Sequence, residues 1–381
     1  MAIKNITMGN YGDYFLKLLL PSLFGLSVAA VHFTGLRGPS TSLGPIEFVL
    51  ASIATVIIFR NYILEKKSVE FVFLAPIIYL VCITLPMTFV NLFLELPGIR
   101  WQTTFALIFV SYVALSFAYL KKYELEYFGN GIAALIIFSF TTSLITGDIF
   151  NQFIRYAFLA DNPNQLAVYS ICSAFLVSYL ITNKIFKNIA VSICILYGLL
   201  SVSDSLYLSI FISFSSYLIM RIFTKGYIIL MLSILLMLGL IAIVINFQET
   251  EFISFFIDLW YSADEGGARI NLIINGLIAF LDSPIIGHGG GAFSGAYNPY
   301  MRFEAHNTFV DFLTIAGPIF TLLFYSPFVL AVKILFQERK FLETSLLLGV
   351  LSYTLFHFVG RHPIIWIIWA VTVKIFIIRR R

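Results

Sequence analysis

The sequence predicts an all-α polytopic membrane protein with about 12 transmembrane helices. Composition is the first observation behind this prediction. Hydrophobic residues make up 60% of the 381 residues and charged residues only 12%, whereas a soluble domain is about 25% charged. Repeated apolar runs of roughly 20 residues, the length that crosses a bilayer, are the second. We therefore expect a single integral membrane domain over residues 1–381, with a lipid bilayer and no nucleic acid as its partner.

The apolar runs define the predicted spans in order. They cover residues 14–33, 45–63, 69–92, 101–120, 130–147, 164–182, 187–202, 206–222, 226–247, 306–334, 341–358 and 362–378. Most connections between them are short. The exception is the stretch 248–305, and a loop of that length in a compact fold usually carries function or is disordered. Cys82, Cys172 and Cys194 lie inside apolar runs without metal or redox spacing, so we interpret them as packing residues.

The positions of the cations predict the orientation. With the N-terminus inside and alternating spans, 18 of the 24 Lys and Arg residues fall inside and 6 outside, the bias expected of cytoplasmic loops. The outside cations are Arg37, Arg100, Arg155, Arg269, Arg302 and Arg361. The loop 248–305 is therefore predicted to be external.

All 12 lysines fall on the inner side, so every external cation is an arginine. Arginine suits bidentate contact with phosphate, which is one interpretation of this bias. The alternative is that arginine tolerates interface positions well. The five histidines also lie toward the outer side, and no span has an ionisable group near its middle. Because an ion-coupled transporter would normally keep one there, chemistry at the outer surface fits better.

The long external loop contains a predicted amphipathic helix. Apolar residues recur at helical spacing from Ile270 to Leu281, and the helix is too short to cross a bilayer, so we expect it to lie in the outer interface. Arg269 stands at its N-terminus, where the helix dipole disfavours a cation. A bound anion would explain that placement. A surface arginine in a glycine-flanked turn is the alternative.

The sequence GHGGG, residues 287–291, follows this helix and contains His288. It could form a backbone nest for an anion or a turn before the next ordered segment, and we favour the turn. No GxSxG accompanies it, which excludes a lipase-type hydrolase. Neither HExxH nor DxD occurs in the chain, so we expect no metal.

An earlier external loop repeats the same elements. Arg155 precedes the sequence NPNQLA, residues 162–167, which includes Asn162 and Asn164. We expect Asp161 or Asn162 to cap the next helix, with Pro163 as its first residue. Arg155 is open to two interpretations, a phosphate ligand or an interfacial side chain that reaches toward water.

His306 and Asn307 stand where the long loop meets the following span. At about 100° per residue, Gly317 lies on the histidine's face three turns deeper, where it would allow another helix to approach. Pro318 is expected to bend the span. Asp311 lies about 140° round the helix from His306, so it is not an obvious partner for the ring. By spacing alone, His306 could be an interfacial anchor or a catalytic group.

Together these features resemble the O-antigen ligase and O-antigen polymerase superfamily of bacterial inner-membrane glycosyltransferases. The family pattern has about a dozen spans, a late periplasmic loop with an arginine and a Gly-rich turn, then a histidine followed by Asn, Ser or Gln. Here it reads His306-Asn307, nine residues to Ala316, then Gly317-Pro318-Ile319-Phe320. Phe320 departs from the small or hydroxyl residue at the last position. The resemblance covers about residues 150–335.

The resemblance implies that the chain is a multi-pass enzyme of the bacterial inner membrane with its active site facing the periplasm. It would transfer a glycan from undecaprenyl pyrophosphate to an acceptor hydroxyl, with no cofactor. Arg155 and Arg269 map onto the family's functional arginines and His306 onto its histidine, as a base or acceptor-orienting group. Further predicted substrate-binding residues are Arg302, Asn307, Asn162, Asn164 and His288. A chain-length-determining co-polymerase is a further expected partner.

The resemblance leaves two acceptors open. A polymerase would use another lipid-linked repeat unit of lipopolysaccharide or capsule, and a ligase would use lipid A–core. The short chain, the Phe-rich and Ile-rich composition and the imperfect final motif favour the polymerase. A transporter for the same lipid-linked glycan is a third hypothesis, which would require a continuous polar path across the spans.

Overall fold

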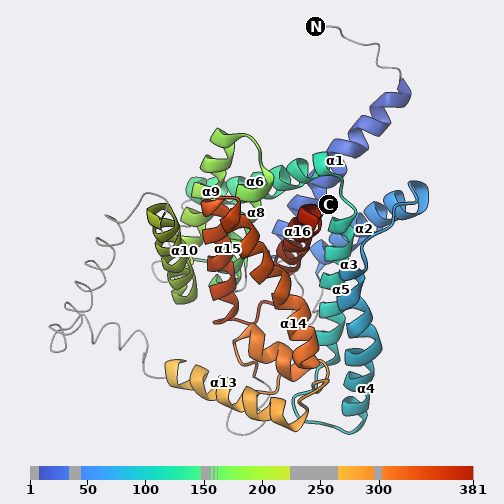
Figure 1. The fold of residues 1–381 in the computed structure, drawn as a ribbon, viewed down its shortest axis with the longest axis vertical. Helices are drawn as coiled ribbons and strands as arrows, with labels where there is room; N and C mark the ends of the chain where they lie inside the picture. Colours follow the sequence, from blue (N-terminus) through green and yellow to red (C-terminus); the bar gives the residue numbers. More distant parts are fainter. Residues whose placement is uncertain are drawn as a thin grey trace, which may run out of the picture.

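The computed structural model describes residues 8–33, 44–146, 156–157, 159–160, 162–223, 265–295 and 303–380. Within these ranges the chain is all-helical, with a single bridge between Ile99 and Gly291 and no strand (Figure 1). The all-α part of the predicted fold class is therefore confirmed. The division into domains stays a prediction.

The first half of the bundle contains long apolar helices, one interrupted by a π-helical turn and one ending in such a turn. Its helices are α1 (Met8–Ala30), α2 (Pro45–Ile58), η2 (Phe59–Leu64), α3 (Phe71–Tyr79), η3 (Leu80–Thr84), α4 (Leu85–Phe93), α5 (Trp101–Ala118) and α6 (Lys122–Ile145). Pro76 lies inside α3 and Pro86 in the first turn of α4. Because proline removes a backbone donor, the segment 71–93 continues through η3 rather than as one regular α-helix.

The second half contains the helices that carry the candidate site. They are α8 (Pro163–Leu180), α9 (Lys184–Leu199), α10 (Asp204–Phe223), α13 (Glu265–Asp282), α14 (Thr308–Gln337), α15 (Phe341–Thr354) and α16 (Pro363–Arg380). Figure 1 shows α13 running across one end of the molecule, beneath the start of α14. The predicted helix in the long loop is thus present as α13.

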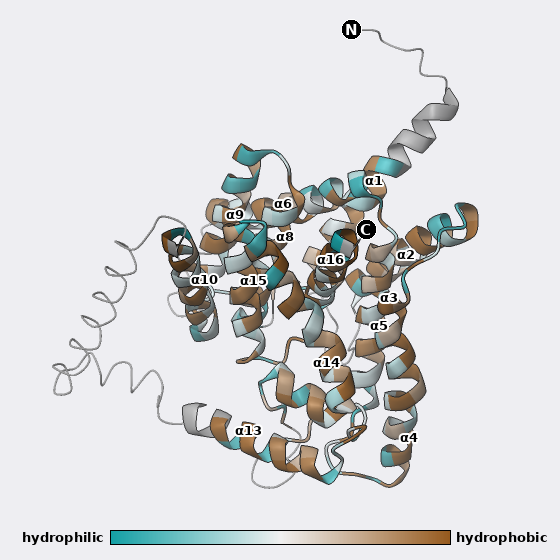
Figure 2. Cartoon of the chain, in the orientation of Figure 1, coloured by the Kyte–Doolittle hydropathy of each residue, from teal (hydrophilic) through white to brown (hydrophobic). Residues whose placement is uncertain are grey.

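Every predicted span except one coincides with a helix, and the exception, 226–247, lies outside the described residues. Six helical stretches in the described part of the chain are long and apolar enough to cross a membrane: 45–64, 71–93, 101–118, 122–145, 204–222 and 308–337. Figure 2 shows that hydrophobic residues predominate along these helices. These helices support a multi-pass membrane protein. The predicted number of about 12 transmembrane helices stays a prediction.

Helices α8 and α16 form the centre of the bundle. Residues 166–178 of α8 are all buried, and so are residues 363–373 of α16, including Trp366 and Trp369. A helix that is buried on every side belongs in the core rather than at the lipid boundary. The N-termini of these two core helices are therefore held firmly in place, and both lie at the candidate site.

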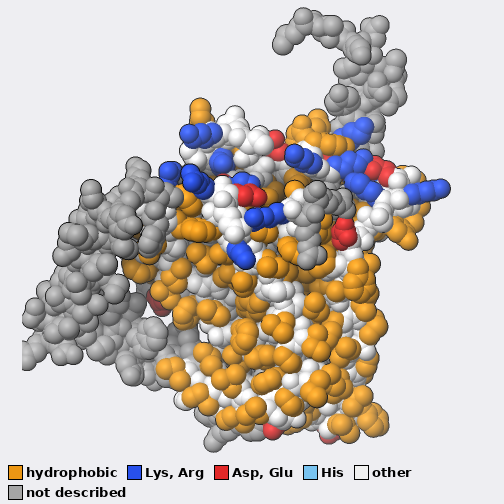
Figure 3. All heavy atoms as spheres, viewed as in Figure 1, with side chains coloured by type: hydrophobic (Ala, Val, Ile, Leu, Met, Phe, Trp, Pro, Cys, Tyr) orange, Lys and Arg blue, Asp and Glu red, His pale blue; other side chains and the backbone are white. Residues whose placement is uncertain are grey.

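The two ends of the bundle carry different charges. At one end, which we call the lysine end, Lys121 pairs with Glu65 at 2.7 Å and Lys187 with Glu343 at 3.7 Å. Figure 3 shows Lys and Arg side chains gathered there, above a broad hydrophobic surface. At the other end, the histidine end, lie His306, His357, His362, Arg100 and Arg361. This separation agrees with the cation asymmetry of the sequence.

Candidate functional site

His306 occupies a tight turn immediately before α14. Its backbone has φ = 52°, in the left-handed region that non-glycine residues adopt uncommonly, although histidine is among those enriched there. Such a conformation costs about 1–3 kcal/mol and persists only where the surroundings impose it. The turn at His306 is therefore held by specific contacts rather than by local preference.

Asp311 supplies those contacts from within the first turn of α14. Its side chain is buried, with 1% exposure. The carboxylate accepts the backbone N–H of Ala305 at 2.8 Å and that of Asn307 at 3.4 Å. These are the residues on either side of His306, so Asp311 fixes the backbone that carries the ring. The sequence analysis did not predict this backbone role of Asp311.

Asn307 and Thr308 join the turn to the connection between α15 and α16. Asn307 is the N-cap of α14, where its Oδ1 accepts the backbone N–H groups of Phe309 and Val310, and its Nδ2 donates to the Leu355 carbonyl at 2.9 Å. The Thr308 hydroxyl donates to the His357 carbonyl at 2.6 Å and accepts the Val359 N–H at 2.9 Å. The geometry gives Asn307 a structural role, and its predicted substrate contact stays a prediction.

The N-terminus of α8 lies at the same end. Asn162 caps the helix by accepting the Asn164 N–H at 2.8 Å, with Pro163 as the first helical residue, as predicted. Asn164 accepts two further hydrogen bonds, from the Ser203 hydroxyl at 2.9 Å and, through its carbonyl, from the Tyr353 hydroxyl at 2.9 Å. These contacts tie the NPNQLA segment to α15.

A series of ring contacts leads from α8 back to the histidine turn. The Tyr353 ring stacks on His357 with centroids 5.1 Å apart. His357 in turn meets His306 edge to face, with centroids 6.2 Å apart. These contacts link Asn164 and His306 at the histidine end of the bundle.

A cavity of about 400 Å³ opens beside this region, between the ends of α1, α2, α5, α8 and α16. Its polar lining consists of Glu47, Arg100, Gln102, Thr103, Gln165, Arg361 and His362. The Arg361 guanidinium also forms an ion pair with Glu304, at 2.8 Å, two residues before His306. Arg361 therefore bridges the cavity and the histidine turn.

Neither Arg100 nor Arg361 was selected as a site residue from the sequence. Both belong to the arginine-only external set, and that set was the signal that could have identified them. The predicted site arginines, Arg155 and Arg269, came from the resemblance to the family motif instead. Because Arg361 follows the α15 span by only a few residues, nothing local in the sequence links it to a site beside α14.

Three arginines are predicted site residues: Arg155, Arg269 and Arg302. Arg155 and Arg302 lie outside the described residues. Arg269 lies within α13, which begins at Glu265, so the prediction that Arg269 stands at the helix N-terminus is wrong. Helix α13 packs against the start of α14 through Gly276, where an added Cβ would come within 2.6 Å of the Val310 side chain. Its apolar face, including Ile274 and Leu281, is exposed, as an interfacial helix requires.

The GHGGG segment forms an ordered turn whose amides are bonded to protein. The N–H groups of His288 and Gly289 donate to the carbonyls of Thr314 and Ile315, at 2.7 and 2.9 Å, and the Gly290 N–H donates to the Thr88 hydroxyl. Because these N–H groups already donate to protein acceptors, they are not available to bind an anion. The geometry therefore favours the turn over an anion-binding nest. The His288 ring lies 2.7 Å, through Nε2, from the Ala279 carbonyl, which ties it to α13.

Gly317 explains why this turn is needed. It has φ = 75° and ψ = 179° inside α14, and Pro318 follows it, so the helix is broken there. The break leaves carbonyls of the preceding turn without helical donors, and the GHGGG turn supplies two. A Cβ at Gly317 would lie 2.2 Å from the Ile285 carbonyl oxygen. The predicted bend is confirmed, but the close neighbour is the Ile285-Ile286 segment that leads into the GHGGG turn rather than another helix.

Comparison with known proteins gives one family. No curated protein matches the chain. The model of the family described as O-Antigen ligase matches residues 189–325. This interval runs from α9 to the middle of α14 and includes α13, the GHGGG turn, His306 and Gly317. This part of the chain is therefore similar to the O-antigen ligase family, which confirms the resemblance that the sequence motifs indicated.

Proposed function

We propose that this protein is an O-antigen or capsule repeat-unit polymerase of the bacterial inner membrane. It transfers a glycan from undecaprenyl pyrophosphate to a hydroxyl of another lipid-linked repeat unit, at the periplasmic face. The observation that carries the proposal is the rigid His306 turn beside an arginine-lined cavity, within a chain that matches the O-antigen ligase family.

In the proposed reaction the acceptor oxygen attacks the anomeric carbon of the donor glycan. The bond between that carbon and the pyrophosphate oxygen breaks, and its electron pair leaves with the pyrophosphate. His306 takes the proton of the attacking hydroxyl, a role that needs a fixed ring position. The backbone held by Asp311 gives the ring such a position.

Fixed cations stabilise the charge that develops on the leaving pyrophosphate. No nucleotide or metal is needed if guanidinium groups supply this stabilisation, since forked donors bind phosphate oxygens in pairs. Arg155 and Arg269 are proposed from the family resemblance. Arg361 and Arg100 are added because both line the cavity beside the histidine turn.

The ligase is the second candidate, because the matching family model carries that name. Both enzymes use the same donor and differ in the acceptor, lipid A–core for the ligase. The departure at Phe320 from the last position of the family motif favours the polymerase. A chain-length-determining co-polymerase remains a proposed partner.

Deletion of the gene for this protein distinguishes the polymerase from the ligase. Loss of a polymerase should leave single repeat units attached to lipid A–core, because the ligase of that strain still acts. Loss of a ligase should leave bare core and polymer on the lipid carrier. We expect the first result when lipopolysaccharide and carrier-linked glycans are compared by gel and mass spectrometry. The second would replace the polymerase assignment with the ligase.

A further inference from the structure

A second cavity, of about 680 Å³, lies at the lysine end, across the bundle from His306. It is lined by Lys184, Lys187, Asn188, Tyr217, Arg221, Arg339, Lys340, Phe341, Leu342 and Glu343. The lining thus combines five cations with a single carboxylate. A general bias toward cytoplasmic cations explains their presence at this end but not their convergence on one cavity.

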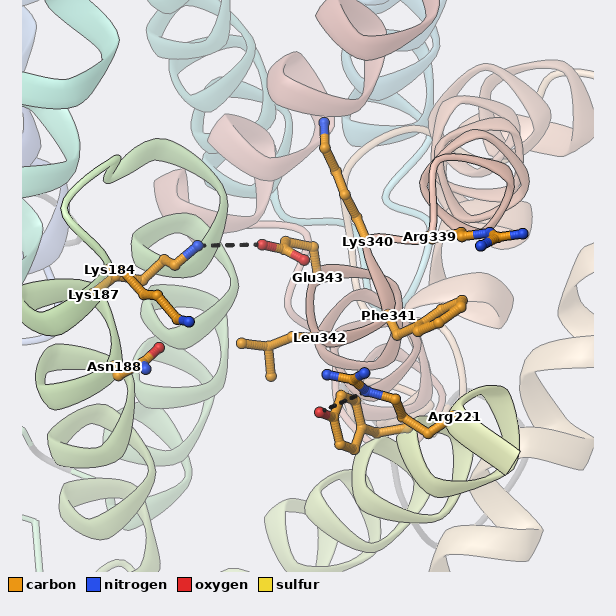
Figure 4. Close-up of a pocket in the computed structure, with 10 residues that line it drawn as sticks. Lys184, Lys187, Asn188, Arg221, Arg339, Lys340, Phe341, Leu342 and Glu343 are labelled. Carbon is orange, nitrogen blue, oxygen red and sulfur yellow. Dashed lines mark hydrogen bonds and ion pairs between the residues drawn. The ribbon is translucent and has the colours of Figure 1, made fainter. Parts of the chain in front are cut away.

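Figure 4 shows how these side chains are arranged. Lys184, Lys187 and Asn188 of α9 lie on one side of the cavity and Arg221 of α10 on the other. Arg339 and Lys340 extend away from the centre, and Lys340 pairs with Glu338 at 2.8 Å. The centre is therefore framed by the cations of α9 and α10.

The two lysines occupy an unfavourable position on their own helix. Lys184 is the first residue of α9 and Lys187 lies in its first turn. A helix N-terminus carries partial positive charge and disfavours cations. Lys187 is partly compensated by Glu343, at 3.7 Å. An anion in the cavity would compensate both lysines and the helix terminus together.

An apolar stripe leads along α10 to Arg221. Phe211, Phe214 and Leu218 are exposed by 64%, 61% and 41%. Together with Arg221 they span only about 80° of the helix at 100° per residue. The Arg221 side chain also lies over the Tyr217 ring, 5.6 Å from its centroid. An exposed apolar stripe that ends at a cation fits a ligand with an acyl chain and a phosphate.

We propose that this cavity binds the phosphate of an anionic phospholipid from the adjacent leaflet, with an acyl chain along the α10 stripe. Basic pockets between transmembrane helices on the cytoplasmic side recognise such headgroups. The site is separate from the glycan-transfer chemistry at the histidine end, and its occupancy would stabilise the contact between α9, α10 and α15.

The test uses the full-length protein in nanodiscs of phosphatidylethanolamine with or without phosphatidylglycerol. Native mass spectrometry counts the lipids retained, and the unfolding temperature reports stabilisation. We expect phosphatidylglycerol to be retained in preference to phosphatidylethanolamine and to raise the unfolding temperature. Lys184→Gln and Arg221→Gln should each weaken retention about fivefold. The matched control, Lys122→Gln, changes an exposed lysine of the same end outside the cavity.

Three outcomes would overturn the proposal. Equal retention of the two lipids would exclude selectivity for an anionic headgroup. Unchanged phosphatidylglycerol retention in both cavity variants would show that the lipid binds at another site. Stabilisation by inorganic phosphate alone, in phosphatidylethanolamine nanodiscs, would make the ligand a soluble phosphate. In nanodiscs of phosphatidylethanolamine alone, the two cavity variants should unfold at the same temperature as the unmodified protein. This control separates a loss of lipid binding from a loss of folding.

Discussion

The two ends of the bundle hold their charges in different ways. At the lysine end, carboxylates pair with cationic side chains, as the exposed Glu65 does with Lys121 and the buried Glu124 with Arg60. At the histidine end, the buried carboxylate of Asp311 accepts backbone N–H groups and fixes one ring. Exposed pairs contribute little to stability, whereas a buried carboxylate bonded to backbone fixes geometry. We therefore place the proposed chemistry at the histidine end, whereas the lysine end holds the proposed phospholipid site.

The largest expected difference between the ends is their accessibility from the two sides of the membrane. In a Cys82→Ser background, Asp282→Cys at the histidine end should react with an impermeant thiol reagent in intact spheroplasts. Lys122→Cys at the lysine end should react only after lysis. Both native residues are exposed, and the other two cysteines, Cys172 and Cys194, are buried. The reverse labelling pattern would invert the orientation and move the proposed site to the cytoplasm.

A smaller difference is expected between two arginines. Arg361→Ala should lower transfer by about 10²-fold, because a fixed donor beside the leaving group is lost. Arg361→Lys should recover only part of that activity, since the forked donor is absent. The control is Arg379→Ala at the lysine end, where the guanidinium contacts Gln337. Activity is measured with reconstituted protein and lipid-linked glycan. If Arg361→Ala is as active as Arg379→Ala, Arg361 is not part of the site.

The smallest expected effect concerns two carboxylates. Asp311→Asn keeps the shape of the side chain but replaces one acceptor oxygen with an NH2 group. One backbone N–H of the turn then loses its hydrogen-bond acceptor. We expect about 2 kcal/mol lower stability and about tenfold slower turnover, which corresponds to roughly 1.4 kcal/mol in the barrier. Glu65→Gln, which breaks an exposed ion pair at the lysine end, should cost less than about 1 kcal/mol. Unchanged turnover in Asp311→Asn would show that the turn does not need its carboxylate.

Much of the fold could be predicted because apolar runs are a local signal. The cap at Asn162, the helix now seen as α13 and the bend near Pro318 followed from residues adjacent in sequence. The helix count is harder, because length and hydropathy single out only six stretches among the described residues.

The site was predictable only in part, since it depends on contacts between distant segments. The motif identified His306, but its contact with His357 joins the turn before α14 to the α15–α16 connection. The ion pair between Arg361 and Glu304 likewise links positions 57 residues apart. Helical spacing within one span cannot reveal such pairs.

The most direct test of the proposed chemistry is the replacement of His306 by Ala and by Gln. Each variant would be reconstituted without added metal, with a lipid-linked glycan as donor and acceptor, and donor binding measured separately. A general base is worth about 10²- to 10⁴-fold in rate, so both variants should bind donor and fail to polymerise. Asn307→Ala, which removes a helix cap, should stay partly active. A strongly active His306→Gln enzyme would contradict the base role and leave pyrophosphate departure as the main source of catalysis.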